Sequence, residues 1–88
     1  MAGQTKQMTD FSKSNCRRLA EKLSPQETAV LRLMVQGLAT KQIADQLDLA
    51  APTVSVYRER IYSKLGVNSL APAVRLATVA GLCLTPRT

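Results

Sequence analysis

The residues best suited to chemistry cluster between Pro52 and Leu65, and their chemistry is that of nucleic-acid recognition. Ser55 can exchange a hydrogen bond with any base, Val56 can contact a thymine methyl group, and Glu59 can accept from the cytosine amino group. Four cationic side chains in or near this stretch are candidates for phosphate contact: Lys41, Arg58, Arg60 and Lys64. The stretch therefore predicts a surface that contacts both the bases and the backbone of DNA.

Glu59 allows a second interpretation, because phosphates repel a carboxylate that has no partner. It can instead pair with Arg58, Arg60 or Lys64 on the surface of a helix. Arg58 and Arg60 point to different sides of such a helix, and an ordinary solvated face would carry similar charges. Neither arginine is diagnostic alone.

Composition favours a small, basic, helical protein. The 88 residues give room for one domain, and the core must come from Leu, Val, Ile and Ala because only 3% of the residues are aromatic. Twelve Lys and Arg against six Asp and Glu give a net charge of +6, which attracts polyanions such as nucleic acid or an anionic membrane. Residues 1–22 hold five of the bases and two of the acids.

Several classes of function lack the residues that they need. There is no histidine, no glycine-rich phosphate loop, and no obvious pair of carboxylates, so we expect no enzyme, no catalytic residue and no cofactor. Cys16 and Cys83 match no metal or redox spacing, so we expect no metal site. No apolar run is long enough to span a bilayer. Without a secretory signal ahead of the cysteines, the cytoplasm is the expected location.

Periodicity predicts an all-α fold of four helices, with room for a short fifth helix over 12–22, capped by Ser12 or Ser14. The first main helix begins at Ser24-Pro25-Gln26-Glu27, where Ser24 and Glu27 can form a reciprocal capping box, and stops at Gly37. The next helices are expected over about 40–47 and 52–65, and the last begins after Ser69, which can cap it, and runs to Gly81. We expect residues 1–10 to be disordered.

Two of these helices form a helix-turn-helix arrangement. The helix over 40–47 and the longer helix over 52–65 are joined by only Asp48-Leu49-Ala50-Ala51, and in this motif the second helix can enter a major groove. Val54, Ile61 and Leu65 define its buried side, which leaves Ser55, Val56 and Glu59 facing outward. We therefore expect the outward face to meet the DNA.

The last helix carries more apolar residues than one buried stripe requires. From Leu70 to Leu82 only Pro72, Arg75, Thr78 and Gly81 are not apolar, so a second apolar side is available for a partner. The alternative is a last helix that is merely well buried.

From Leu23 to about Leu82 the chain resembles the LuxR-type helix-turn-helix domain, also called the GerE or NarL/FixJ type. Several short motifs match in the right order: Leu23-Ser24-Pro25-Gln26-Glu27 with Val30-Leu31, Gly37-Leu38, Ile43-Ala44 with Leu47, Thr53-Val54, and Lys64-Leu65-Gly66-Val67 followed by Ser69. The domain organisation is then a basic segment over 1–22, the DNA-binding domain over 23–82 and a tail over 83–88.

The resemblance implies a bacterial regulator whose third main helix lies in the major groove of double-stranded DNA and whose fourth forms a two-fold dimer contact. In the family, positions matching Ser55, Val56 and Glu59 commonly face bases. Positions matching Lys41, Thr53, Tyr57 and Lys64 commonly contact the backbone. The dimerising helix corresponds to about Leu70 to Thr78, with Leu70, Ala71, Val74, Arg75 and Thr78 as the expected interface.

This sequence departs from the family pattern at several positions. Ala39 and Ala50 stand where capping serines are usual, Asp48 where the turn usually has glycine, Tyr57 where histidine is usual and Pro72 where an acidic residue often caps. Ser55 and Glu59 replace basic or amide residues, which weakens phosphate attraction on that face.

Two functions follow from these observations. The first is a sequence-specific transcriptional regulator that binds DNA as a homodimer in the bacterial nucleoid. The second is an interaction module whose last helix captures another transcription regulator and inhibits it. A third role, membrane or RNA association through the basic segment over 1–22, has little support, because that segment lacks interleaved aromatics and a clear apolar face. Extra phosphate contact is the expected role of its bases Lys13, Arg17, Arg18 and Lys22.

Overall fold

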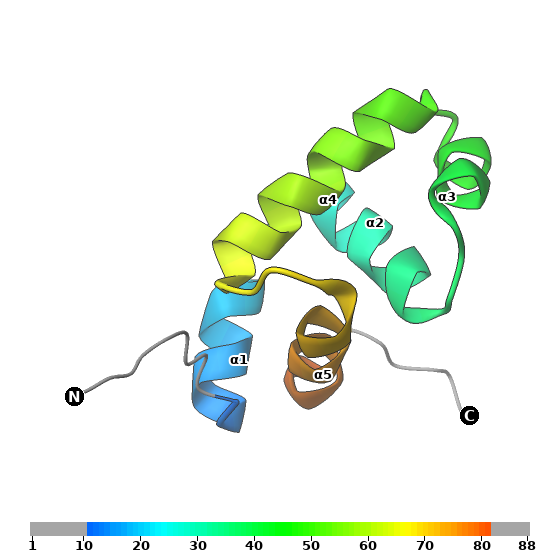
Figure 1. Cartoon of the computed structure of the whole chain (residues 1–88). Helices are drawn as coiled ribbons and strands as arrows, with labels where there is room; N and C mark the ends of the chain where they lie inside the picture. The colour runs from blue at the N-terminus through cyan, green and yellow to red at the C-terminus, as the bar shows by residue number, and fades with distance from the viewer. Residues whose placement is uncertain (1–10, 82–88) are drawn as a thin grey trace.

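The computed structural model describes residues 11–81, and in that part of the chain the secondary structure is five α-helices and no strand (Figure 1). The helices are α1 (Lys13–Ala20), α2 (Pro25–Val35), α3 (Thr40–Leu47), α4 (Ala51–Leu65) and α5 (Leu70–Ala80). The predicted all-α fold is confirmed, and the additional short helix is present as α1. The disorder expected for residues 1–10 and the residue Cys83 lie outside the described residues.

The first two helices begin at the serine caps that the sequence predicts. Ser12 Oγ accepts a hydrogen bond from the Asn15 backbone N–H at the start of α1. At the start of α2, Ser24 Oγ accepts from the Glu27 N–H at 3.1 Å, while Glu27 Oε1 accepts from the Ser24 N–H at 2.9 Å. This reciprocal pair satisfies two backbone donors that would otherwise lack a helical partner.

The two helices of the motif, α3 and α4, begin without serine caps. Ala39 and Ala50 occupy the N-cap positions of α3 and α4, and neither side chain can accept a hydrogen bond. Gln42 Oε1 compensates in part, because it accepts from the Ala39 N–H at 2.7 Å. Asp48 turns the chain in the left-handed region with φ of 57°, which Asp tolerates better than most residues. The longer helix starts at Ala51, one residue before the predicted Pro52.

The prediction that the Ser69 side chain caps the last helix is wrong. Ser69 does occupy the N-cap position of α5, but its side chain makes no capping hydrogen bond. A capping side chain accepts from the N–H of the second or third helical residue, and the third residue here is Pro72, which has no N–H. One of the two donors that a cap could use is therefore missing.

The core is formed mainly by aliphatic side chains of α2, α3, α4 and α5, and α1 contributes Cys16. Its largest fully buried members are Leu31, Ile43, Ile61, Leu65, Leu76, Val30, Val54 and Cys16. The long helix α4 packs on α2 and α3, while α1 packs mainly on α5 and also touches α4 (Figure 1). Cys16 is the most deeply buried residue of α1.

Candidate nucleic-acid interface

The outer side of α4 is an exposed face opposite the core. Val54, Ile61 and Leu65 are fully buried, as predicted, whereas Ser55, Glu59 and Arg60 are exposed. Val56 exposes 47% of its surface. Successive helical residues are about 100° apart, so the three predicted base-contacting residues lie within one third of the helix circumference. The face combines an apolar contact with two polar groups.

Two edges flank this face. The same helical spacing places Thr53, Arg60 and Lys64 along one edge and Arg58 on the opposite side of α4. The exposed Lys41 belongs to α3, the helix that packs beside Arg58. Cationic groups thus lie on both sides of the candidate base-contacting residues, which is the arrangement that a helix between two phosphate backbones requires.

Arg58 ties α4 to the start of α3. Its Nη1 donates to Thr40 Oγ1 at 2.7 Å, and its Nη2 donates to the Tyr62 hydroxyl at 3.3 Å. Both contacts are partly buried. Because the bond joins the two helices of the motif directly, Arg58 helps to fix the angle at which α4 is presented. A phosphate contact by the remaining N–H groups stays a prediction.

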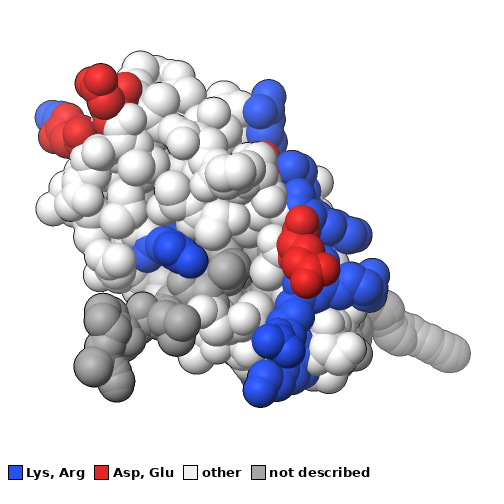
Figure 2. Space-filling model, turned by 180° about the vertical axis from the view of Figure 1, so that it is seen from behind, with Lys and Arg blue, Asp and Glu red and all other residues white. Residues whose placement is uncertain are grey.

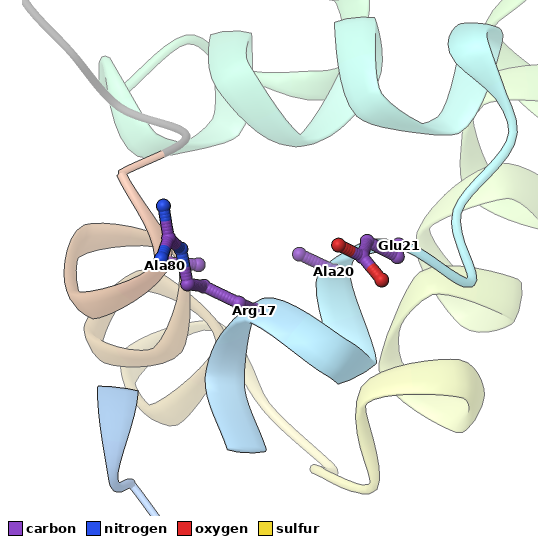
Figure 3. A pocket seen from close by; sticks show the side chains of 4 residues that line it. All are labelled: Arg17, Ala20, Glu21 and Ala80. Carbon is purple, nitrogen blue, oxygen red and sulfur yellow. The ribbon is translucent and has the colours of Figure 1, made fainter. Parts of the chain in front are cut away.

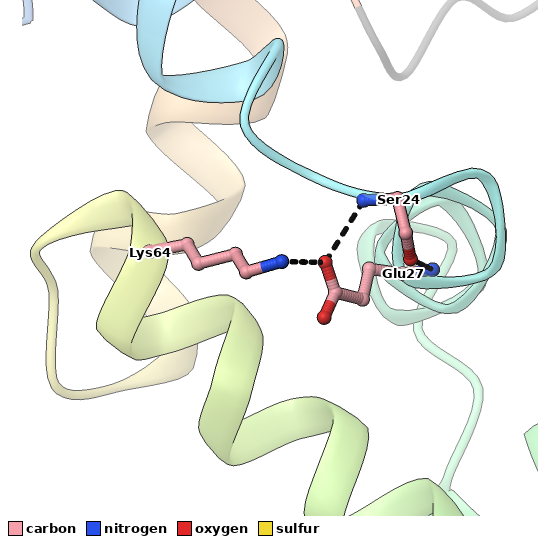
Figure 4. A network of polar contacts seen from close by, with 3 residues as sticks. All are labelled: Ser24, Glu27 and Lys64. Atoms are coloured by element: carbon pink, nitrogen blue, oxygen red, sulfur yellow. Dashed lines mark hydrogen bonds and ion pairs between the residues drawn. The ribbon is translucent and has the colours of Figure 1, made fainter.

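Lys64 is held by a carboxylate from another helix. Its Nζ donates to Glu27 Oε1 at 2.7 Å, and the same oxygen accepts from the Ser24 backbone N–H (Figure 4). The Lys64 side chain is 39% exposed and that of Glu27 only 4%. Lys64 therefore has a structural role, and its predicted phosphate contact would have to be made by an ammonium group that already has one partner.

The surroundings of Glu27 lower the pKa of its carboxyl group. Burial alone raises the pKa of this carboxyl, but the hydrogen bonds from Lys64 and from the Ser24 N–H, together with the Lys64 charge, lower it further than burial raises it. The net effect is a pKa below the ordinary value for glutamate. Glu27 is therefore a charged, buried anchor at neutral pH.

The remaining predicted contacts differ in exposure. Thr53 is exposed and Tyr57 is half-buried. Glu59 is exposed. Across residues 11–81, the one ion pair with a nitrogen–oxygen distance of 4.0 Å or less joins Lys64 to Glu27. The alternative prediction, in which Glu59 pairs with a cation on the surface of the helix, is therefore not observed. The Glu59 carboxylate is thus accessible to a base or an incoming cation.

A second exposed stripe lies on α5. Leu70, Ala71, Arg75 and Thr78 are exposed and Val74 is half-buried, while Ala73, Leu76 and Ala77 are fully buried. The other side of α5 is covered by α1, and the Arg75 guanidinium stacks 4.3 Å from the Phe11 ring centroid. The apolar excess of α5 is thus used partly by α1, and the stripe with the predicted dimer residues stays open except at the Arg75 guanidinium, which lies over Phe11.

Other kinds of site are not indicated within the described range. Among residues 11–81, no group of three or more His, Cys, Asp or Glu side chains could hold a metal ion. No helix in that range is both long and apolar enough to cross a membrane.

The short helix α3, its left-handed turn at Asp48 and the exposed outer face of α4 together define a helix-turn-helix DNA-binding domain. Sequence comparison agrees. The GerE family, described as bacterial regulatory proteins of the luxR family, matches residues 21–77. The chain therefore belongs to this family of DNA-binding transcription regulators, which are not enzymes.

Similar proteins are longer than this chain. The chain is 41% identical to nodulation protein W of Bradyrhizobium diazoefficiens over 69 residues, which covers 78% of this chain and 30% of that protein. It is 42% identical to the transcriptional regulatory protein FixJ of the same organism over 60 residues, 68% of this chain and 29% of that protein. It is 44% identical to the fimbriae Z protein of Escherichia coli over 55 residues, 62% of this chain and 26% of that protein. The matched region spans less than a third of each of these relatives.

Proposed function

We propose that the chain regulates transcription by binding specific double-stranded DNA sites as a homodimer, with α4 in the major groove. The observation that carries this proposal is the exposed outer face of α4, where Ser55, Val56 and Glu59 lie between cationic edges. Ser55 and Glu59 offer hydrogen-bonding groups for base edges, and Val56 offers an apolar contact for a thymine methyl group. Thr53, Tyr57 and Arg60 on α4 and Lys41 on α3 would contact phosphates.

The dimer part of the proposal rests on α5. Ala71, Val74, Arg75 and Thr78 follow the spacing of a single helical stripe, and Leu70 at the helix start is 39% exposed. A two-fold axis would bring this stripe against its own copy, because a closed dimer uses the same surface twice. Each copy would then place its own α4 on one half of a palindrome-like site.

The remaining parts of the proposal follow from this role. The DNA-binding domain spans about residues 23–82, with a basic segment over 1–22 and a tail over 83–88. The protein would act in the bacterial cytoplasm, on the nucleoid.

DNA selection across a salt series tests the α4 part of the proposal. Ser55→Ala and Glu59→Gln should relax the sequence preference, because base contacts carry it. Arg60→Gln should weaken binding to all sites alike and reduce the salt slope by about 0.9, the loss expected for one phosphate contact. Arg60 is a better probe than Lys64, whose replacement also removes the contact with Glu27. Arg32→Gln, which removes an exposed charge from α2, is the matched control.

Absence of DNA binding by the unmodified chain at low salt would overturn the proposal.

The oligomeric state separates the two functions considered for α5. Val74→Asp should convert a self-dimer into a monomer and lower affinity for a two-fold site much more than for a half-site. A tight complex with another transcription regulator, together with no affinity for DNA, would favour the inhibitory module instead.

A further inference from the structure

The exposed side of α1 carries a concentration of positive charge. Residues 13–22 hold four bases, Lys13, Arg17, Arg18 and Lys22, against one acid, Glu21, and thus half of the net charge of +6. All five side chains are exposed. The family match covers residues 21–77, so α1 itself lies ahead of the matched domain. This charge is an addition to the helix-turn-helix unit.

The position of α1 connects this charge to the candidate DNA interface. The C-terminal end of α1 lies beside the C-terminal end of α4, and the two helices are in contact (Figure 1). The Ser24 N–H and Lys64 Nζ bond the same Glu27 oxygen, which holds the chain just after α1 against the end of α4. Lys22 precedes Ser24 by two residues. Lys22, just after the end of α1, therefore lies near the end of α4 that carries Lys64, and the other charges of α1 precede it along the same helix.

The surface view agrees with this placement. Figure 2 shows Lys and Arg side chains gathered along one edge of the molecule, with an acidic side chain among them, while most of the remaining face is uncharged. This is the edge on which Figure 1 places α1 and the C-terminal part of α4. A long row of cations of this kind matches a linear polyanion better than a small anionic ligand.

Duplex DNA is the polyanion that this surface fits best. A membrane-surface helix needs an open apolar side, but the apolar side of α1 is occupied, with Cys16 fully buried and Leu19 packed on the core. Single-stranded nucleic acid is usually bound by stacking on aromatic rings, and α1 has none. Lys and Arg beside a groove-binding helix suffice for contact with a phosphate backbone.

We propose that Arg18 and Lys22 contact the phosphates of duplex flanking the site bound by α4, so that α1 extends the DNA footprint beyond the helix-turn-helix domain. This inference rests on the proposed function. Arg18 donates to Asn15 Oδ1 at 2.5 Å, which holds its guanidinium on the exposed side of the helix and leaves other N–H groups for a phosphate. Glu59 lowers the positive charge on the outer face of α4, and the α1 surface supplies attraction that this face lacks.

Arg17 is left out of the proposed contact because of its place on α1. Its side chain extends toward Ala80 at the end of α5, over a shallow hollow of about 170 Å³ that Ala20 and Glu21 also line (Figure 3). It therefore lies on the α5 side of α1.

The test compares two duplexes that contain the same selected site. One duplex is trimmed to that site, and the other has additional base pairs on each side of it. Fluorescence anisotropy gives the affinity and salt slope of the full chain and of the variants Arg18→Gln, Lys22→Gln and their combination. Each replacement should reduce the salt slope on the flanked duplex by about 0.9 and leave binding to the trimmed duplex unchanged. Arg32→Gln should match the unmodified chain on both duplexes. Arg18→Lys keeps the charge and should retain the advantage of the flanked duplex.

The outcomes separate this inference from the proposed function. If the unmodified chain binds neither duplex, the proposed function fails. If it binds its site but the combined variant keeps the same salt slope on the flanked duplex, the α1 contact is wrong while the regulator proposal stands. The contact is also overturned if the combined variant loses binding to phosphatidylserine vesicles while its DNA binding is unchanged.

Discussion

Lys64 near the end of α4 donates to Glu27 near the start of α2 across 2.7 Å, although the two residues are 37 positions apart in the chain. Glu27 also belongs to the capping box of α2 through Ser24. One carboxylate therefore starts one helix and fixes the end of another. Because α4 presents the candidate base-contacting residues, this pair helps to set their position.

Removing either partner of this pair should destabilise the fold. Lys64→Met would leave a nearly buried carboxylate with the Ser24 groups alone, at an expected cost of about 1–2 kcal/mol in the free energy of unfolding. Glu27→Gln should cost about 1 kcal/mol, because the amide oxygen can still accept and Lys64 is partly solvated. Urea denaturation measures both. Unchanged unfolding of Lys64→Met would contradict the structural role given to this ion pair.

Acid should weaken the unmodified protein partly through Glu27. Since the folded-state pKa of Glu27 is lowered, its contribution to stability is complete above the unfolded-state pKa, near 4.3, and is lost as the pH falls through the folded-state value. The stability difference between the unmodified chain and Glu27→Gln should therefore shrink on acidification below about pH 4. Thermal unfolding between neutral and acid pH checks this. Glu21→Gln, which alters an exposed acid, should follow the unmodified chain, and a constant difference for Glu27→Gln would count against the mechanism.

The bond between Thr40 and Arg58 should appear as an energetic coupling. Thr40→Val removes the acceptor, and Arg58→Met removes the donor while keeping an aliphatic side chain. A double-mutant cycle on the free energy of unfolding should give a coupling of about 1 kcal/mol. The same variants should weaken specific DNA binding, because the hydrogen bond that helps to fix the angle between α3 and α4 is lost. Strictly additive effects on unfolding would mean that the hydrogen bond contributes nothing.

The helix caps make a paired prediction. Ala39→Ser would complete the capping box that Gln42 already half forms, and should stabilise the protein by about 1 kcal/mol. Ser69→Ala should change stability by only about 0.3 kcal/mol or less, because the Ser69 side chain makes no capping bond ahead of Pro72. Thermal unfolding of the two variants tests the pair. A large loss for Ser69→Ala would show that this hydroxyl has a role that the structure does not reveal.

Local signals were sufficient to predict most of the fold. The capping box at Ser24, the short connection that begins at Asp48 and the buried stripe of Val54, Ile61 and Leu65 all depend on residues close in sequence, and all are present. The prediction for Ser69 was wrong because it considered the serine alone. It did not take into account that Pro72, the third residue of the helix, has no N–H to donate. The exposed face of α4 also followed from periodicity alone.

The contacts that position the candidate site could not be predicted in the same way. Lys64 and Arg58 were predicted to contact phosphates or, as the alternative, to pair with Glu59. Their partners in the structure, Glu27 and Thr40, lie on other helices. Nothing in their spacing indicates a bond, because only the packing of the helices brings them together. Likewise, the stacking of Phe11 on Arg75 depends on α1 docking against α5. The sequence predicted which residues face outward, but the helix packing determines which of them already have partners.

The complete burial of Cys16 in the inner side of α1 has a practical consequence. A thiol reagent can reach this sulfur only while α1 is detached from the core, so the labelling rate of Cys16, in a Cys83→Ser background, measures how often that detachment occurs. The chain thus carries its own probe of local opening. Following the rate with and without bound DNA would show directly whether contact with DNA holds α1 in place.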